Sequence, residues 1–184
     1  MEIVEVFKCD ECGFDNAALD NDGLAASVGS FAKRYRMPLT RFLANEDGNA
    51  IVRRRPAPEV WSALEYAAHY RDVIDFYARR IDAILSVDRP QLGGFDIEGE
   101  AERGDYNVLD PATVADEIGA ASESLHARLA TLQPGDWARV GIAIDGTSER
   151  DVRNCVSRVS HEGGHHLLDI GRSLRAARDT AKLA

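Results

Sequence analysis

The sequence predicts an all-α protein, a four-helix bundle behind a short leader that contains a Cys-x-x-Cys motif. Four segments place apolar residues at intervals of three and four, which is the spacing of one face of an α-helix. Helices of this kind bury their apolar faces by packing against one another. We therefore expect residues 1–20 to form the leader and residues 21–178 to form one bundle domain.

The first two helices are predicted on either side of a loop at residues 45–49. The first helix should open near Asp22, an acceptable N-cap, and Pro38 either kinks it or starts a new turn. The second helix should run from about Val60 to Leu85. Its apolar stripe consists of Tyr66, Tyr70, Val73, Ile74, Tyr77, Ile81 and Ile84.

A long connection at residues 86–109 joins the second helix to the third. A connection of this length in a compact domain is either functional or loosely ordered, and this one can lie over a cleft. The third helix should begin at Asp110-Pro111, because aspartate suits the N-cap and proline suits the first helical position.

The fourth helix is predicted near the end of the chain. A short extended stretch within residues 137–144 and a turn at Asp145-Gly146 should precede it, and Thr147 or Ser148 should cap it. Gly163 falls within its apolar stripe. An interior glycine costs a helix about 1 kcal/mol relative to alanine, so we expect another backbone or a ligand to approach closely there.

Charge and composition exclude several classes of function. A formal net charge of −9 argues against a protein that binds nucleic acid, which normally presents a basic surface. No segment approaches the roughly 18 apolar residues that a membrane-spanning helix needs, and the N-terminus lacks a signal-peptide pattern. We therefore expect a cytoplasmic protein that acts on a small molecule, with neither a membrane nor a nucleic acid as partner.

Three of the five histidines lie within residues 160–169. His161 and His165 are four apart, so a helix stacks them on one face, where two neutral imidazoles can bind one divalent metal. That face lies away from the apolar stripe, whereas His166 lies on the apolar side. The pair is therefore either an ordinary surface pair or a site that another element covers.

The leader carries a second candidate metal-binding motif, Cys9-x-x-Cys12, which is half of a structural zinc site or a redox pair. No second Cys-x-x-Cys exists, so the obvious partners are Cys155 and the histidine cluster. A closed Cys2His2 site would use His161 and His165. The alternative is an exposed, reduced dithiol on a flexible leader.

His69 lies at the edge of the apolar stripe of the second helix, one turn beyond Glu65. A lone histidine in such a place is usually structural. If the second and fourth helices meet at a cleft, however, His69 joins the other histidines in a three-ligand set. Such a set leaves a coordination position open for water or substrate, which distinguishes catalytic zinc from structural zinc.

Two motifs together resemble those of the DinB-like superfamily of metal-binding four-helix bundles. They are Trp61-Ser62-x-x-Glu65-x-x-x-His69 and His161-x-x-x-His165-His166, and the resemblance covers roughly residues 20–175. It implies that His69, His161 and His165 are the metal ligands, with His166 and Asp169 close beside them. The Cys-x-x-Cys leader departs from the family pattern. So does the Leu167-Leu168-Asp169 sequence, where family members often carry a glutamine.

The resemblance also implies an enzyme, because the superfamily includes thiol-dependent S-transferases and the mycothiol-dependent maleylpyruvate isomerase. A divalent metal, Zn²⁺ or alternatively Ni²⁺ or another ion, would activate water or a low-molecular-weight thiol such as mycothiol or bacillithiol. The preferred reaction is S-transfer or isomerisation of a small electrophile. Glu162 or Glu65 would serve as general base, Arg158 or Arg172 would hold a substrate carboxylate, and the protein would form a homodimer.

Two alternatives to the enzyme remain open. In the first, a closed site formed by Cys9, Cys12, His161 and His165 makes the protein a non-catalytic, metal-binding structural or interaction protein. In the second, the bundle binds no metal and serves in an interaction. The nature of the metal ligands separates these hypotheses, because sulfur ligands belong only to the closed site.

Overall fold

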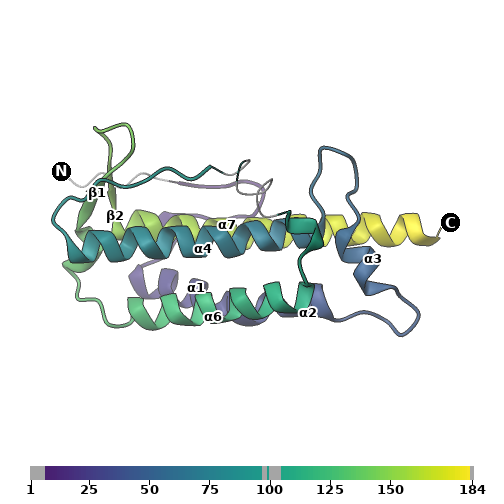
Figure 1. Ribbon diagram of the computed structural model, residues 1–184. Coiled ribbons are helices and arrows are strands. Elements are labelled where there is room, and N and C mark those ends of the chain that lie inside the picture. The colour runs from purple at the N-terminus through teal and green to yellow at the C-terminus, as the bar shows by residue number, and fades with distance from the viewer. Residues whose placement is uncertain (1–6, 97–98, 100–104, 183–184) are drawn as a thin grey trace.

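Four long helices form the body of the protein in the computed structural model, which describes residues 7–96, 99 and 105–182. These helices are α1 (Asn21–Arg34), α4 (Ala63–Ser86), α6 (Pro111–Leu129) and α7 (Val152–Lys182). Helix α4 packs along α7 and α1 packs along α6, so the two pairs form two layers (Figure 1). The predicted four-helix bundle is confirmed.

Shorter elements connect the long helices. The helical ones are the 3₁₀ turns η1 (Asn16–Ala18), η2 (Tyr106–Val108) and η3 (Asp136–Ala138) and the helices α2 (Arg36–Thr40) and α3 (Gly48–Arg53). Part of the predicted connection between α4 and α6, residues 97–98 and 100–104, lies outside the described residues. Across the described part of the chain, no helix combines the length and apolarity that a bilayer crossing requires.

Aspartate and serine side chains cap the long helices. The carboxylate of Asp20 accepts from the backbone N–H of Gly23 at 2.7 Å, so α1 begins slightly before the predicted Asp22. Asp110 caps α6 with Pro111 at its first position, as predicted. Ser62 caps α4, and the carboxylate of Glu65 accepts in return from the N–H of Ser62 at 2.8 Å. Each cap satisfies backbone donors that a helix cannot satisfy itself.

The predicted cap of the fourth helix is wrong. Thr147 and Ser148 belong instead to a turn in which the Asp145 carboxylate accepts from both backbone N–H groups, at 2.8 and 2.7 Å. The turn closes an antiparallel hairpin of β1 (Val140–Ile142) and β2 (Glu149–Asp151). Helix α7 starts after that hairpin, because strand pairing claims residues that could otherwise have extended the helix.

Gly163 lies where α7 crosses the buried aromatic rings of α1 and α4. A Cβ atom there would lie 2.6 Å from both Phe31 Cε2 and the Tyr70 hydroxyl oxygen. Tyr35 stacks on Tyr70 with ring centroids 4.6 Å apart and donates a hydrogen bond to the Gly163 carbonyl at 2.9 Å. The predicted close approach at this glycine therefore exists, but aromatic side chains make it rather than a ligand or another backbone.

Candidate metal centres

Helix α7 carries two rows of metal-ligating side chains. His161 and His165 form one row, and Glu162 and His166 form a second row, turned by about 100° around the helix axis. The structure gathers these rows into two groups, which we call the inner and the outer group. The inner group is His69, Glu162 and His166, and the outer group is Cys9, Cys12, His161 and His165. Within each group, one ligand atom from every residue lies within 4.8 Å of all the others.

The inner group lies between α4 and α7. His69 projects from α4 and is 3% exposed, and its ring centroid is 5.0 Å from that of His166. Nε2 of His166 lies 3.2 Å from an Oε2 oxygen of Glu162. Aromatic rings surround the two imidazoles: Trp61 and Phe95 lie beside His69, and Tyr66 stacks on His166 at 5.4 Å. This apolar lining strengthens electrostatic interactions within the group.

Two buried nitrogens of the inner group make no hydrogen bond of good geometry with the described residues: Nδ1 of His69 has no partner, and Nε2 of His166 has the Glu162 carboxylate beside it at 3.2 Å. Nδ1 of His166 lies 3.1 Å from the Asp169 carboxylate, so it holds the proton and leaves Nε2 as the ligand atom. A carboxylate behind a ligating imidazole is typical of metal sites. Two imidazoles and one carboxylate suit zinc and related divalent metals, so the inner group fits a metal ion.

The charges of the inner group also suit a cation. Burial, followed by the charge of His166, lowers the pKa of His69 to about 4, so this imidazole is neutral at neutral pH. Burial opposes ionisation of Glu162, but the neighbouring imidazoles of His161 and His166 outweigh it and hold its pKa well below the ordinary range. Burial likewise opposes protonation of His166, and the neighbouring carboxylates of Asp169 and Glu162 raise its pKa overall. The group therefore combines a neutral ligand with a fixed negative charge.

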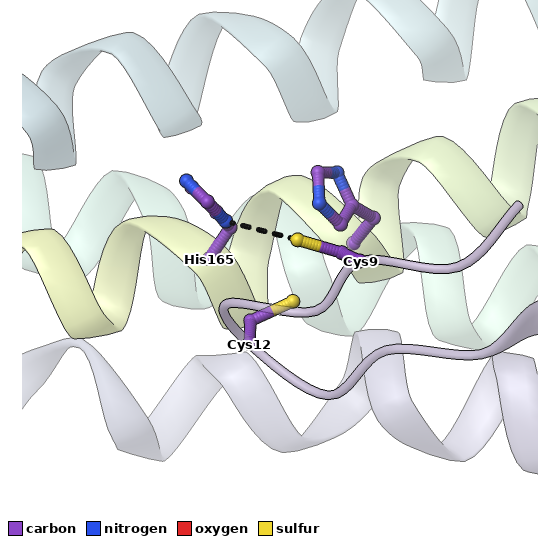
Figure 2. Close-up of side chains that lie close together, drawn as sticks. Cys9, Cys12 and His165 are labelled. Atoms are coloured by element: carbon purple, nitrogen blue, oxygen red, sulfur yellow. Dashed lines mark hydrogen bonds between the residues drawn. The ribbon is translucent and has the colours of Figure 1, made fainter.

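The outer group forms where the leader folds back onto α7 (Figure 2). A tight turn brings the two cysteines together: the Cys9 carbonyl accepts from the N–H of Gly13 at 2.9 Å, and the N–H of Cys9 donates to the Phe14 carbonyl at 2.8 Å. Gly13 has a φ of 73°, a left-handed conformation that favours glycine. The Cys9 side chain points toward His165, with its Sγ 3.6 Å from Nδ1, and Cys12 lies beside it on the same turn.

Hydrogen bonds and burial give the two thiols of the outer group different acidities. A hydrogen bond from the backbone N–H of Cys12, followed by the nearby imidazole of His161, lowers the pKa of Cys9 to about 6. Burial raises the pKa of Cys12. Cys9 is therefore largely a thiolate at neutral pH, and thiolate is the form of cysteine that binds metals.

The leader is fixed to α7 by contacts outside the cysteines. The Phe7 ring meets His161 edge-on, with ring centroids 4.5 Å apart. The guanidinium of Arg158 lies over the same Phe7 ring, 4.3 Å from its centroid. Arg153 donates hydrogen bonds to the carbonyls of Asn16 and Leu19 at 2.8 and 2.6 Å. The leader therefore lies along α7 rather than hanging free of it.

The structure divides the predicted ligands between the two groups. His69 lies with His166 and Glu162, whereas His161 and His165 lie with the cysteines. Helix geometry explains the division, since the face of the His161–His165 pair is turned away from α4, as its position outside the apolar stripe indicated. The described residues thus do not gather His69, His161 and His165 at one point, and the ligand identities themselves remain predictions.

The predicted catalytic residues Glu65, Arg158 and Arg172 lie outside both groups. Glu65 caps α4 and forms an ion pair with Arg55, so its carboxylate is already engaged. Arg172 pairs with Glu11 of the leader and with Asp169, at 3.3 Å each, on the outer side of α7. Arg158 also lies on that side, over Phe7. Neither metal-ligating group of the described residues includes Glu65.

Sequence reasoning missed the ligand position of Glu162 and the enclosing ring of Phe95. Glu162 and His166 have the same i, i+4 spacing as His161 and His165. That spacing places Glu162 and His166 together on the apolar side of the helix, and it could have identified them as ligands of the inner group. Phe95 lies in the irregular connection after α4, where no periodicity indicates which way a side chain points.

The fold and the two groups define a four-helix-bundle protein with clustered metal-ligating side chains. Residues 37–170 match the DinB superfamily, and the chain belongs to this superfamily. A solved structure with a similar fold is that of YfiT from Bacillus subtilis, described as a probable metal-dependent hydrolase with an unusual four-helix bundle topology. It superimposes with a TM-score of 0.75 at 15% identity, covering 84% of this chain and 86% of YfiT. The comparison with curated proteins found no match.

Proposed function

We propose that the protein is a metal-dependent enzyme whose reaction centre is the inner group of His69, Glu162 and His166. The observation that carries this proposal is the convergence of ligand atoms from all three residues, one of which, His69, has a buried Nδ1 without a hydrogen-bond partner among the described residues. Leaving such a nitrogen unsatisfied in a protein interior costs about 1–3 kcal/mol. A bound cation removes that cost.

Three protein ligands leave a coordination position for a reactant. A divalent cation bound there, zinc by preference and nickel as the alternative, supplies Lewis acidity that lowers the pKa of a coordinated thiol or water. Asp169 holds the proton on Nδ1 of His166 and fixes the orientation of that ring. Trp61, Tyr66 and Phe95 exclude water and form apolar walls for a small electrophile.

Two nucleophiles suit this centre. The resemblance to thiol-dependent members of the superfamily favours a low-molecular-weight thiol such as mycothiol or bacillithiol, with S-transfer or isomerisation as the reaction. In S-transfer, the sulfur bonds to an electrophilic carbon, the leaving group takes the electron pair and the thiol proton passes to solvent. The description of YfiT favours water and hydrolysis instead. We place the thiol reaction first.

The substrate in this proposal is a small molecule and not a nucleic acid, because a net charge of −9 repels phosphates. The proposed setting is the cytoplasm, where such thiols occur. The homodimer remains a prediction, which light scattering of the purified protein checks.

Metal analysis of single variants tests the reaction centre. His69→Ala and His166→Ala should each lose about one equivalent of metal per chain, because each removes one of three ligands. His126→Ala is the matched control: this histidine bonds the Ala25 carbonyl at 2.9 Å, on the α1–α6 side of the bundle. Unchanged metal content in both test variants would remove the basis for a metal centre here.

A second experiment separates the two nucleophiles. The metal-loaded protein is incubated with a small electrophile, with and without added mycothiol or bacillithiol, and the products are identified by mass spectrometry. Thioether products that disappear in His69→Ala support thiol transfer. Hydrolysis products that form at the same rate without thiol support the hydrolase.

The alternative of a non-catalytic metal-binding protein also has an observation in its favour, the four-residue outer group. If metal is lost only when the cysteines are replaced, and never when His69 or His166 is replaced, this alternative describes the protein. A structural or interaction role would then take the place of catalysis.

A further inference from the structure

We propose that the outer group is a second metal site, a closed Cys2His2 zinc site in which Cys9, Cys12, His161 and His165 fasten the leader to α7. This site is separate from the reaction centre proposed above, and its function is structural. Four protein ligands fill a zinc tetrahedron and leave no position for a reactant.

The donor set and its spacing suit zinc. Two residues separate the cysteines and three separate the histidines, and structural zinc sites typically show two to four and about three to five. Thiolate and imidazole together favour zinc over magnesium or calcium, which prefer oxygen ligands. A helix supplies one pair of ligands and a tight turn supplies the other, so both pairs are already close before an ion binds.

The distances also suit a tetrahedron. Zinc binds sulfur at about 2.3 Å and imidazole nitrogen at about 2.0–2.1 Å, so a sulfur and a nitrogen on one ion lie about 3.5 Å apart. The Cys9 Sγ to His165 Nδ1 distance is 3.6 Å. This separation suits a hydrogen bond that involves sulfur, and it is also close to the tetrahedral edge. One ligand atom from each of the four residues lies within 4.8 Å of the others, so small side-chain movements complete the site.

His161 supplies independent support. Its side chain is buried, and its Nδ1 lies 3.1 Å from Oε1 of Glu162, which fixes the proton on that nitrogen. Nε2 is buried and makes no hydrogen bond within the described part of the chain. An unpaired buried nitrogen is costly. A zinc ion held with the Cys9 sulfur satisfies it.

The leader provides a shield for such a site. The rings of Phe7 and Phe14 both lie against His161, with centroids 4.5 and 5.7 Å away. Arg172 pairs with Glu11 beside the turn. These contacts bring the cysteines to α7, but the leader adds few residues to the buried core, so a zinc ion would contribute much of the free energy that holds it there.

Glu162 connects the outer site to the inner group. Its Oε1 lies 3.1 Å from His161 Nδ1, while its Oε2 lies 3.2 Å from His166 Nε2. Zinc binding at the outer site would fix the ring of His161 and thereby the carboxylate of Glu162. This part of the inference rests on the proposed function, because it matters only if Glu162 serves the reaction centre.

X-ray absorption at the zinc edge tests the site directly. The sample is His166→Ala, which lacks an inner ligand and so leaves the outer site as the principal zinc site. Two sulfur scatterers at about 2.3 Å and two nitrogens at about 2.0–2.1 Å are expected. A spectrum with nitrogen and oxygen only overturns the proposal, whatever the state of the inner group.

Cysteine variants provide the second measurement. Cys9→Ser and Cys12→Ser should each lose about one zinc equivalent and keep the inner one. Cys155→Ala is the matched control, because this cysteine is buried in the core and lies outside the outer group. Retention of all zinc in both serine variants contradicts the proposal. If the inner site does not bind metal, His69→Ala instead leaves the zinc content unchanged. The failure of the outer site and the failure of the inner site therefore give different results.

Alkylation of the wild-type protein avoids any folding defect of the variants. Zinc should slow the reaction of Cys9 and Cys12 with iodoacetamide at least tenfold, and a chelator should restore it. Equal alkylation rates with and without zinc, or a Cys9–Cys12 disulfide in the protein as isolated, would overturn the site. Hydrogen exchange at residues 7–20 should rise when the chelator is added.

Discussion

His165 and His166 are adjacent in the chain, yet they belong to different groups of candidate ligands. Their ring centroids are 5.8 Å apart and their planes differ by 81°. One step along an α-helix turns the side chain by about 100°, so the first ring faces the leader and the second faces α4. A single helix can thereby serve two metal sites of different chemistry.

Replacing these neighbours one at a time should separate the two sites. His166→Ala should abolish inner-site metal binding and lower turnover at least tenfold, because it removes a ligand. His165→Ala should leave inner-site metal in place but increase hydrogen exchange in residues 7–20. Metal analysis, an activity assay and exchange mass spectrometry provide the readouts. The same pattern of losses from both variants would contradict two separate groups.

The bundle itself was predictable because its signals are local. Apolar spacing within each helix and the Asp110-Pro111 start of α6 depend on neighbouring residues alone. The start of α7 was not predictable in this way. It depends on the pairing of Val140–Ile142 with Glu149–Asp151, and strand pairing is set by partners elsewhere in the chain.

The candidate site was predictable only in part. Helix periodicity correctly placed His166 on the apolar side, but the resemblance assigned the ligand role to His161 and His165. The alternative Cys2His2 set followed from the scarcity of other partners for the cysteines, and the structure brings those four residues together. The fold-back of the leader depends on contacts such as that of Phe7 with His161, which sequence patterns do not reveal.

Asp169 should act on the inner site through His166. Asp169→Asn removes the charged acceptor at 3.1 Å from Nδ1, so His166 becomes a weaker ligand with a less fixed ring. We expect metal affinity to fall about 10- to 100-fold, as measured by competition with a chelator. Asp179→Asn, an exposed position on the same helix, is the control and should bind metal normally. An unchanged affinity in Asp169→Asn would contradict the positioning role.

The ion pair of Arg55 and Glu65 should stabilise the fold in a pH-dependent way. The Glu65 side chain is 8% exposed and that of Arg55 is 42% exposed, so Arg55→Ala leaves a nearly buried carboxylate without its partner. Discounting for the exposed arginine, we expect a loss of about 1–2 kcal/mol in the free energy of unfolding at pH 7. The exposed pair of Arg79 and Asp75 supplies the control, and Arg79→Ala should cost less than about 0.5 kcal/mol.

The sign of the pH dependence follows from Glu65. Burial opposes its ionisation, but Arg55 and Ser62 outweigh burial and lower its pKa below the ordinary 4.5. A carboxyl group with a lowered pKa in the folded state contributes stability above its ordinary pKa, and this stability is lost as the pH falls through the folded value. The difference between wild type and Arg55→Ala in urea unfolding should therefore shrink below pH 4.5. A difference that grows on acidification would contradict the assignment.

The two neighbouring glycines of α7 should respond oppositely to alanine. Gly163→Ala places a methyl group 2.6 Å from Phe31 and Tyr70, and forcing these buried rings apart costs about 1–3 kcal/mol. Alanine's greater helix propensity returns only about 1 kcal/mol, so the free energy of unfolding should fall by up to about 2 kcal/mol. Gly164→Ala meets no atom of the described residues within 4 Å and should gain up to about 1 kcal/mol. Urea unfolding of both variants measures the contrast, and equal stabilities would mean that α7 does not pack against the aromatic rings as closely as the structure has it.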